Sequence, residues 1–311
     1  MLRRYTGCFK KKGYSEVKEV SEVSSITVAK VLNNNVIIAQ HPQYAEVVVI
    51  GKGIGFNRKV RDLINLSSVE KMFILRNQEE QEQYKQLVPQ VDEKLIEVVQ
   101  EIVLHILQSS RQPLNEHIHI ALTDHISFAI RRNEQNIAIH NPFLYETKEI
   151  YPEEYSLAEY AVGRINEAMG VRLPPDEIGF VALHIVSALS NRHISEVKEH
   201  SLLIGDLVNL VEDHLEYHIP RDSLDYSRLV THLRFVLERL RRGETVRETS
   251  SLDGLMKREY PEMYMLAWKL TKVIEKRVRI PVYSAEVSYL TIHLQRLAQK
   301  KEDEADMQQP D

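Results

Sequence analysis

Four histidines occupy two pairs of matching positions in this 311-residue sequence. His125 lies in "TDHISFAIRR" and His232 in "VTHLRFVLERL", whereas His184 lies in "DEIGFVALHI" and His293 in "SAEVSYLTIHL". A lone histidine on an apolar helix is usually structural, but recurrence of both positions in both copies favours a functional role. An imidazole nitrogen can bind a metal ion, transfer a proton or accept a phosphoryl group.

Metal binding and acid–base catalysis need more than the histidines. Beyond Asp124 and Glu177, no nearby aspartate or glutamate at ligand spacing completes a metal-binding set, and Cys8 is the single cysteine. The histidines of "HIH" at 117–119 would lie on different sides of a helix. A duplicated catalytic site without a glycine-lined pocket is also unusual, so we expect no metal, no cofactor and no enzyme. A metal- or nucleotide-dependent enzyme stays as an alternative that metal analysis and turnover assays would test.

Phosphoryl transfer to the imidazole is the third chemistry. A phosphate adds about two negative charges at a domain surface and changes how domains associate. The spacing within each copy, 59 residues from His125 to His184 and 61 from His232 to His293, lets two helices bring each pair together.

The elements that position these histidines are predicted to be helices in a tandem repeat. A third matched segment, "YPEEYSLAEYA" at 151–161 and "YPEMYMLAWKL" at 260–270, supports the duplication. Helical spacing begins after Asn77 and continues to about Lys300, and Pro89 predicts a short connecting helix followed by a longer one. We expect two all-α helical-bundle domains, at 78–192 and 193–302, and a flexible tail at 303–311.

The N-terminal part has a different residue pattern, with short runs rich in valine and isoleucine that are typical of β structure. "ITVAKVL", "NVIIAQ", "EVVVIG" and "KMFIL" predict four strands of a small antiparallel sheet within residues 26–77. A sheet of about fifty residues is too small to be secure alone, and dimerisation would be one remedy. Residues 1–25 are expected to be an N-terminal extension, either an added tail or the result of an upstream start.

Composition restricts the class of protein. The chain is 43% hydrophobic and 27% charged, and no apolar run approaches the ~20 residues of a membrane span. The single cysteine and the absence of a signal peptide predict a cytoplasmic protein. Residues 1–77 hold 13 basic and 6 acidic residues, whereas the rest of the chain holds 27 and 39. This asymmetry indicates a basic module for a polyanion joined to an acidic body.

The stretch "VVIGKGIGFNRK" at 48–59 lies in the basic module. Its alternating glycines match neither a dinucleotide fingerprint nor a Walker A loop, and no helix is predicted to follow. Alternating glycines better suit a strand end where the backbone must approach something closely. Phe56 can stack on a base and Lys52 can meet phosphates, together with Arg58 and Lys59. The "NNN" at 33–35 offers amides to base edges, or is simply a hairpin turn.

These motifs resemble those of the BglG/SacY/LicT family of transcriptional antiterminators. "AKVLNNNVII", "EVVVIGKGIGFNRK" and "VEKMFIL" resemble its co-antiterminator RNA-binding domain. "DHISFAI", "EIGFVALHI" and "LTIHL" resemble its paired phosphotransferase-system regulation domains, known as PRDs. The resemblance covers about residues 26–300, and "LNEHIHIALTDHI" and "NPFLYET" are most similar to the glucose branch.

The resemblance implies a homodimeric protein that binds a leader-RNA hairpin and prevents an overlapping terminator from forming. It implies control by the EIIB component of a sugar permease, acting on the first PRD, and by the phosphocarrier HPr, acting on the second. Thr231 stands where the first PRD has Asp124, and Lys52 where many relatives have arginine, which turns a bidentate contact into a point-charge contact. The implied RNA contacts are Lys30, Asn33, Asn35, Gly51, Lys52 and Phe56, and the implied phosphoacceptors are His125, His184, His232 and His293.

An alternative of a different class is a DNA-binding transcriptional activator that carries PRDs. Such a protein would need a recognition helix, and nothing in the N-terminal module resembles a helix-turn-helix. Binding to duplex promoter DNA, but not to leader RNA, would favour this alternative.

Overall fold

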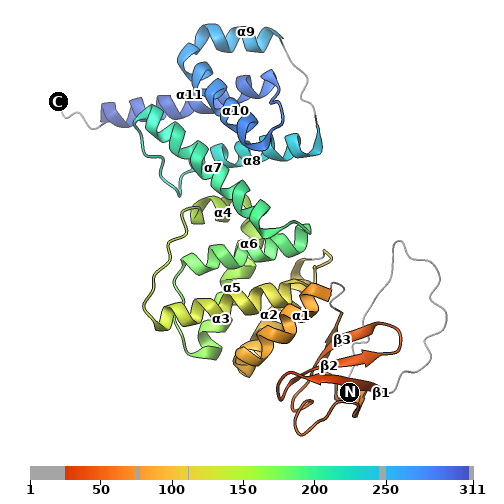
Figure 1. Ribbon diagram of the computed structural model, residues 1–311. Coiled ribbons are helices and arrows are strands. Elements are labelled where there is room, and N and C mark those ends of the chain that lie inside the picture. Colours follow the sequence, from red (N-terminus) through yellow and green to blue (C-terminus); the bar gives the residue numbers. More distant parts are fainter. Residues whose placement is uncertain (1–24, 75–77, 111, 245–249, 308–311) are drawn as a thin grey trace, which may run out of the picture. The chain divides into compact units, whose positions relative to one another are not determined.

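The computed structural model describes residues 25–74, 78–110, 112–244 and 250–307 (Figure 1). The expected N-terminal extension lies outside the described residues, except for Ser25, which begins the first strand. The chain divides into two compact units, residues 1–89 and 90–311. The expected order of a small antiparallel sheet followed by helical bundles is confirmed.

The first unit contains a five-stranded antiparallel sheet with the strand order β4-β1-β2-β3-β5. The four predicted strands correspond to β1 (Ser25–Val31), β2 (Val36–His41), β3 (Ala45–Ile50) and β5 (Lys71–Phe73). The fifth strand, β4 (Leu63–Asn65), pairs with β1 and was not predicted. With three residues and one buried side chain, it is too short to show an alternating pattern.

The sheet is held by short β-branched side chains. Ile26, Val28, Ile37, Ala39, Val47, Val49, Ile54 and Ile64 form one buried cluster. The intervening residues Val36, Ile38, Val48 and Ile50 are buried as well, so β2 and β3 read as continuous apolar runs rather than as an alternation. Helix α1 (Gln78–Leu87) follows in the same unit, and its Lys85 Nζ lies 2.8 Å from Glu46 Oε2 on β3.

The helical unit begins as the proline at position 89 predicts. A short 3-10 helix, η2 (Val88–Gln90), separates α1 from the longer α2 (Glu93–Ser110). The later helices are α3 (Ile118–Glu134), α4 (Leu144–Ile150), α5 (Pro152–Met169), α6 (Asp176–Ser190), α7 (Ile194–Leu215), α8 (Leu224–Arg242), α9 (Ser250–Glu259), α10 (Pro261–Val278) and α11 (Ser284–Met307). Helix α11 continues to Met307, so the segment from 303 that was expected to be a flexible tail is helical for most of its length.

The duplication seen in the sequence is reproduced in the helix ends. Helices α5 and α10 each carry proline in the first turn, preceded by Tyr151 and Tyr260 with nearly identical backbone angles, φ −129° and −132°. Proline fits this position because its missing N–H needs no partner there. Helix α5 is followed by Gly170 and α10 by Arg279, and both residues have left-handed backbone angles. The repeated "YP" motif therefore marks the start of the same helix in both copies.

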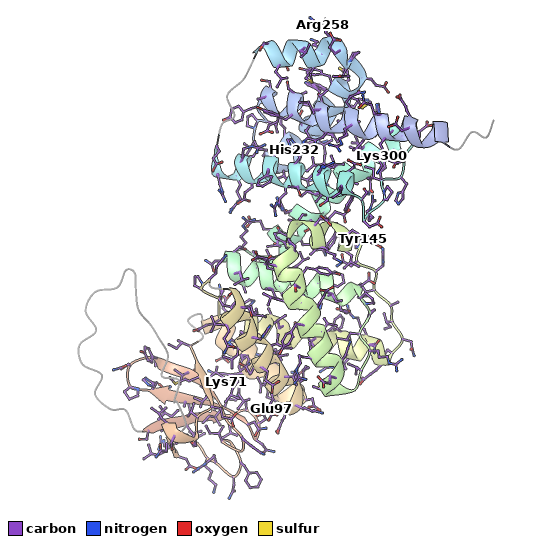
Figure 2. The ribbon with its side chains drawn as sticks, turned by 180° about the vertical axis from the view of Figure 1, so that it is seen from behind. Lys71, Glu97, Tyr145, His232, Arg258 and Lys300 are labelled. Carbon is purple, nitrogen blue, oxygen red and sulfur yellow. The ribbon has the colours of Figure 1, made fainter. Side chains whose placement is uncertain are left out.

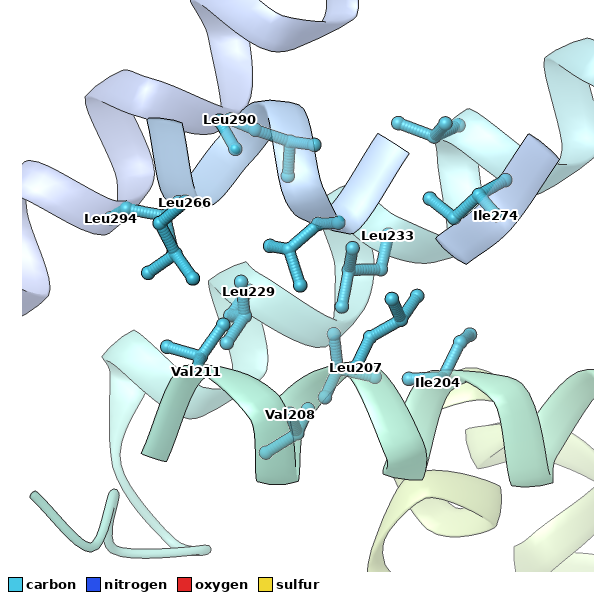
Figure 3. Close-up of a cluster of buried hydrophobic side chains, with 14 of the residues drawn as sticks. Ile204, Leu207, Val208, Val211, Leu229, Leu233, Leu266, Ile274, Leu290 and Leu294 are labelled. Atoms are coloured by element: carbon cyan, nitrogen blue, oxygen red, sulfur yellow. The ribbon is translucent and has the colours of Figure 1, made fainter. Parts of the chain in front are cut away.

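Two groups of helices pack within the second unit. Helices α2, α3, α5 and α6 lie together in the first group, and α7, α8, α10 and α11 in the second (Figure 1). In the second group, leucine, isoleucine and valine side chains from all four helices converge on one core, including Leu207, Leu233, Leu266 and Leu290 (Figure 3). This core holds in place α8 and α11, the helices that carry His232 and His293.

Candidate functional site

The structure brings the predicted histidine pairs together. His125 on α3 and His184 on α6 have ring centroids 4.9 Å apart, and His232 on α8 and His293 on α11 have centroids 4.6 Å apart (Figure 2 labels His232). The two pairs have almost the same tilt between rings, 46° and 43°. All four histidines are half-buried.

A buried carboxylate stands behind the first pair. Glu177, in the first turn of α6, is almost fully buried, and its Oε2 lies 2.9 Å from Nε2 of His125. Its other oxygen, Oε1, accepts a hydrogen bond of 2.6 Å from Nη2 of Arg132 at the end of α3. The charge of a buried carboxylate needs such partners, because desolvation disfavours it strongly. The result is a fixed Arg132–Glu177–His125 chain across α3 and α6.

The second copy has the same residues in a different arrangement. Arg239 donates to both oxygens of Glu286, from Nε at 2.8 Å and from Nη2 at 2.7 Å. Nε2 of His232 lies 3.9 Å from Glu286 Oε2, beyond hydrogen-bond range, and has no hydrogen-bond partner among the described residues. In the second copy the arginine therefore binds both carboxylate oxygens, whereas in the first copy the arginine and the histidine bind one oxygen each.

Burial keeps most of these imidazoles neutral. It lowers the pKa of His184 to about 3, with smaller contributions from His125 and His117. It also lowers the pKa of His232 to about 3, helped by His293 and Arg239, and it lowers the pKa of His293. A neutral ring keeps one nitrogen lone pair, so these side chains have the electronic form that a nucleophile needs near pH 7.

Sequence reasoning missed the arginines of this site. Arg132 follows His125 by seven residues and Arg239 follows His232 by the same distance, while each glutamate precedes the other histidine by seven. Seven residues are about two helical turns, so these pairs share a helix face. The repeated spacing was a signal, but arginine is common on helix surfaces and did not stand out.

Aromatic, basic and acidic side chains lie next to the histidine pairs. Within the described residues, no group of three or more metal-ligating side chains comes together. Phe128, one turn after His125, is exposed and stacks with the Arg132 guanidinium, and Phe235 is likewise exposed beside Arg234. Asp124 is exposed next to His125, whereas Thr231 is half-buried at the matching position.

The second candidate site lies at one end of the sheet, where two loops are joined. The β1–β2 loop holds Asn33 and Asn35, and the loop after β3 holds Gly51 to Phe56. Oδ1 of Asn35 accepts a hydrogen bond of 2.7 Å from the Gly53 backbone, and the Gly55 N–H donates to the Asn34 carbonyl at 2.9 Å. The predicted close approach of the glycine backbone is therefore made, within this chain, to its own asparagine loop.

A different physical constraint disfavours a side chain at each glycine of this stretch. A Cβ on Gly55 would lie 2.2 Å from the carbonyl oxygen of Asn33, and one on Gly51 would lie 2.6 Å from that of Ser68. Gly53 has φ +67°, which favours glycine. The hairpin-turn interpretation of "NNN" also holds in part, because Asn33 Oδ1 accepts from the N–H groups of Asn35 and Val36.

The surface of these loops presents the groups that RNA requires. Phe56 is 69% exposed, which is unusual for an aromatic side chain, and Lys52 projects into solvent from the same loop. Lys30 is exposed on β1, next to an irregularity in its pairing with β2. Arg58 and Lys59 extend the basic surface. By contrast, Gly51 is buried, so only its backbone is available for contact.

A small basic sheet followed by two copies of a helical histidine region defines the class of RNA-binding regulators with duplicated regulation domains. Residues 26–82 match the CAT RNA binding domain, and residues 100–188 and 205–297 each match the PRD domain. The chain belongs to the BglG/SacY/LicT family of transcription antiterminators, and it is an RNA-binding antiterminator regulated through its PRDs.

Several relatives show where in the family the chain falls. The PtsGHI operon antiterminator of Bacillus subtilis is 50% identical over 89% of this chain and 98% of its own length. Protein GlcT of Staphylococcus saprophyticus is 40% identical over 88% and 97%, and LicT of Bacillus subtilis is 35% identical over 88% and 99%. A crystal structure of GlcT CAT-PRDI is 55% identical, covers 54% of this chain and 99% of that one, and has a TM-score of 0.50.

The domain boundaries at 26–77, 78–192 and 193–302 stay predictions, as do the roles of the individual site residues. No helix among the described residues is long and apolar enough to cross a bilayer.

Proposed function

We propose that this antiterminator binds a leader-RNA hairpin that overlaps a terminator, and thereby allows transcription of glucose phosphotransferase genes. The observation that carries the proposal is the exposed Phe56 beside Lys52 on the glycine loop. The names of the relatives, PtsGHI operon antiterminator and GlcT, support the choice of operon. The RNA contacts are Lys30, Asn33, Asn35, Gly51, Lys52 and Phe56.

The two asparagines would contribute in different ways. Asn33 uses its Oδ1 to hold the turn, whereas its Nδ2 is buried without a hydrogen-bond partner among the described residues, so the loop would have to shift for Nδ2 to donate to a base. Asn35 uses Oδ1 to hold the Gly53 backbone, so it shapes the platform as well as contacting RNA. A small sheet of this kind is also expected to act as a homodimer.

Gel-shift titration with the leader hairpin tests the RNA proposal. Phe56→Ala should weaken binding by at least about tenfold, because stacking on one base contributes roughly 1–3 kcal/mol. Tyr44→Ala is the matched control: Tyr44 is 48% exposed in the turn between β2 and β3, at the opposite end of these strands. Affinity should also fall steeply with salt. Equal affinities for Phe56→Ala and the wild-type chain would contradict the assigned surface, and preference for duplex promoter DNA would favour the activator alternative.

We further propose that His125, His184, His232 and His293 are phosphorylated, the first pair by the EIIB component of the sugar permease and the second by HPr. The support is the burial and neutrality of paired imidazoles in both copies. Phosphate on His125 or His184 would disfavour the active dimer through like-charge repulsion. Absence of enzymatic activity and cytoplasmic location stay predictions.

Phosphate-mimicking variants test this control. His125→Asp and His184→Asp should lower both the dimer fraction in sedimentation and antitermination in a reporter strain. His140→Asp is the control, because His140 has an 85% exposed side chain outside the pairs. Unchanged dimerisation and reporter activity in both variants would rule out the repulsion mechanism.

A further inference from the structure

The two copies of the histidine site differ in which neighbour their glutamate binds, and this difference bears on the atom that is modified. We propose that His125 accepts the phosphoryl group on Nδ1, because Glu177 holds Nε2 in its protonated form, whereas no such restriction acts on His232. Glu177 is thus a positioning residue. The inference rests on the proposed phosphorylation of His125 and specifies its chemistry.

The contact with Glu177 determines which nitrogen of the His125 ring carries the proton. Glu177 Oε1 accepts a hydrogen bond from the Arg132 guanidinium, so the side chain acts as a carboxylate acceptor. An ionised carboxylate accepts hydrogen bonds but donates none. Nε2 of His125, at 2.9 Å from Glu177 Oε2, must therefore be the donor and carry the hydrogen. The contact selects one of the two neutral tautomers of the ring.

The other ring nitrogen of His125, Nδ1, is the one left to react. In the tautomer with hydrogen on Nε2, the in-plane lone pair lies on Nδ1. Within the described part of the chain, Nδ1 of His125 makes no hydrogen bond that would occupy this lone pair. Only a nitrogen with a free lone pair can attack phosphorus, so Nδ1 is the nucleophile.

The group transfer balances without an additional reactant. The Nδ1 lone pair forms the new N–P bond while the bond between phosphorus and the donor side chain breaks, and the donor atom keeps that electron pair. The proton stays on Nε2, so the phosphorylated ring carries a positive charge. Glu177 lies against that charge and stabilises it, as carboxylates do for an adjacent imidazolium.

The second copy lacks this arrangement. Glu286 is bound on both oxygens by Arg239, and Nε2 of His232 is 3.9 Å away without a hydrogen-bond partner among the described residues. The carboxylate therefore does not select a tautomer of His232. Glu286 provides a matched control, since it has the same residue type, burial and helix position as Glu177.

The tautomer can be measured on the unmodified full-length chain. Long-range proton–nitrogen NMR of histidine-labelled protein distinguishes the two neutral forms, and the signal that disappears in His125→Asn identifies His125. The expected result is hydrogen on Nε2 in the wild-type chain. Hydrogen on Nδ1 would overturn the proposal, whatever happens on phosphorylation.

The modified atom is identified after incubation with phosphorylated EIIB, by phosphorus NMR that separates the Nδ1 and Nε2 isomers. The Nδ1 isomer should exceed the Nε2 isomer at His125 by at least about tenfold, because a hydrogen bond to a charged group fixes the tautomer. Glu177→Gln, with its fold verified by circular dichroism, should reduce that excess several-fold. Glu286→Gln should leave the isomer ratio at His232, after incubation with phosphorylated HPr, unchanged.

The outcomes separate this inference from the proposed function. Phosphate found on Nε2 of His125 overturns the inference but leaves histidine control intact. Absence of phosphate on His125, under conditions that label the other histidines, overturns the assignment of His125 as an acceptor together with this inference. An unchanged isomer ratio in folded Glu177→Gln overturns the role of Glu177.

Discussion

Histidines that are shielded from water in this chain stay neutral well below the pH at which exposed histidines become charged. Burial lowers the pKa of His184 and His232 to about 3 and that of His200 to about 4. His200 on α7 is held by the Tyr151 hydroxyl, 3.2 Å from its Nδ1, with Arg192 nearby. In the unfolded chain the same side chains titrate near 6.5.

These pKa differences predict an acid-sensitive fold. Between pH 6.5 and about 4 the unfolded chain binds protons that the folded chain does not, so the free energy of unfolding falls as the pH falls. We expect the Tm to be lower at pH 5 than at pH 7.5. His200→Gln, which can keep a hydrogen bond to Tyr151, should reduce the difference, whereas the exposed His140→Gln should not. Equal pH dependence of the Tm in His200→Gln and the wild-type chain would contradict the assignment.

Recurrence was the feature that made single residues predictable. The histidine pairs were predicted correctly because two copies placed them at the same positions, and the structure joins each pair. The difference between Glu177 and Glu286 was not predictable, since the residues are the same and only the hydrogen bonds differ. The distance between histidine Nε2 and the glutamate Oε2 differs by only about one ångström between the copies, 2.9 Å against 3.9 Å. The spacing of residues in the sequence carries no information on so small a displacement.

Elements were predictable where their pattern was long. The helices that follow "YP" and the break at Pro89 are present as expected. The three-residue β4 was missed because only Ile64 is buried in it. The sequence predicted that helix α11 ends near Lys300, whereas it continues to Met307. Its last turns are charged and show no apolar face by which a helix can be recognised from sequence.

Two glycines within helices of the first regulation region predict opposite effects of the same substitution. A Cβ on Gly179 of α6 would lie 2.4 Å from Nδ2 of Asn141, a buried side chain whose Oδ1 accepts from the Phe143 N–H. Asn141 is therefore not free to move, and Gly179→Ala should destabilise the fold by about 1–3 kcal/mol. Gly163 of the neighbouring α5 is exposed with open space around it, so Gly163→Ala should stabilise it by roughly 0.5–1 kcal/mol.

Urea denaturation followed by circular dichroism measures both changes on the full chain. The contrast between the two variants controls for helix propensity, which favours alanine at both positions. A stabilising Gly179→Ala would show that the loop bearing Asn141 moves aside at little cost, and the close packing of α6 against that loop would have to be given up as the reason for glycine.

At the scale of the whole molecule, the two helical regions are joined by buried and partly buried polar contacts within one compact unit. The short helix α4 of the first region meets α8 of the second: Tyr226 donates to Glu146 at 2.8 Å, and Ser227 donates to Glu149 at 2.6 Å. The Arg234 side chain also donates to the Ile150 carbonyl at 2.8 Å. These contacts join residues about eighty positions apart with no counterpart in the repeat, so the sequence pattern gave no indication of them.

The Tyr226–Glu146 hydrogen bond should contribute measurably to stability. Both side chains are buried, and burial together with the Glu146 carboxylate raises the pKa of Tyr226 far above its ordinary value. Tyr226→Phe removes the donor and leaves a buried carboxylate less well satisfied, at a cost of about 1–3 kcal/mol. Tyr145→Phe is the matched control, because Tyr145 is the neighbour of Glu146 on α4 and is exposed (Figure 2).

A double-mutant cycle with Glu146→Gln separates the hydrogen bond from other effects of the substitution. If the bond joins the two regions, the effects of Tyr226→Phe and Glu146→Gln on the free energy of unfolding will be non-additive. In the variants, the unfolding transitions recorded with different probes will then no longer coincide. Additive effects with a single coincident transition would place the coupling elsewhere, in the apolar packing of α4 against α7 and α8 rather than in its carboxylate.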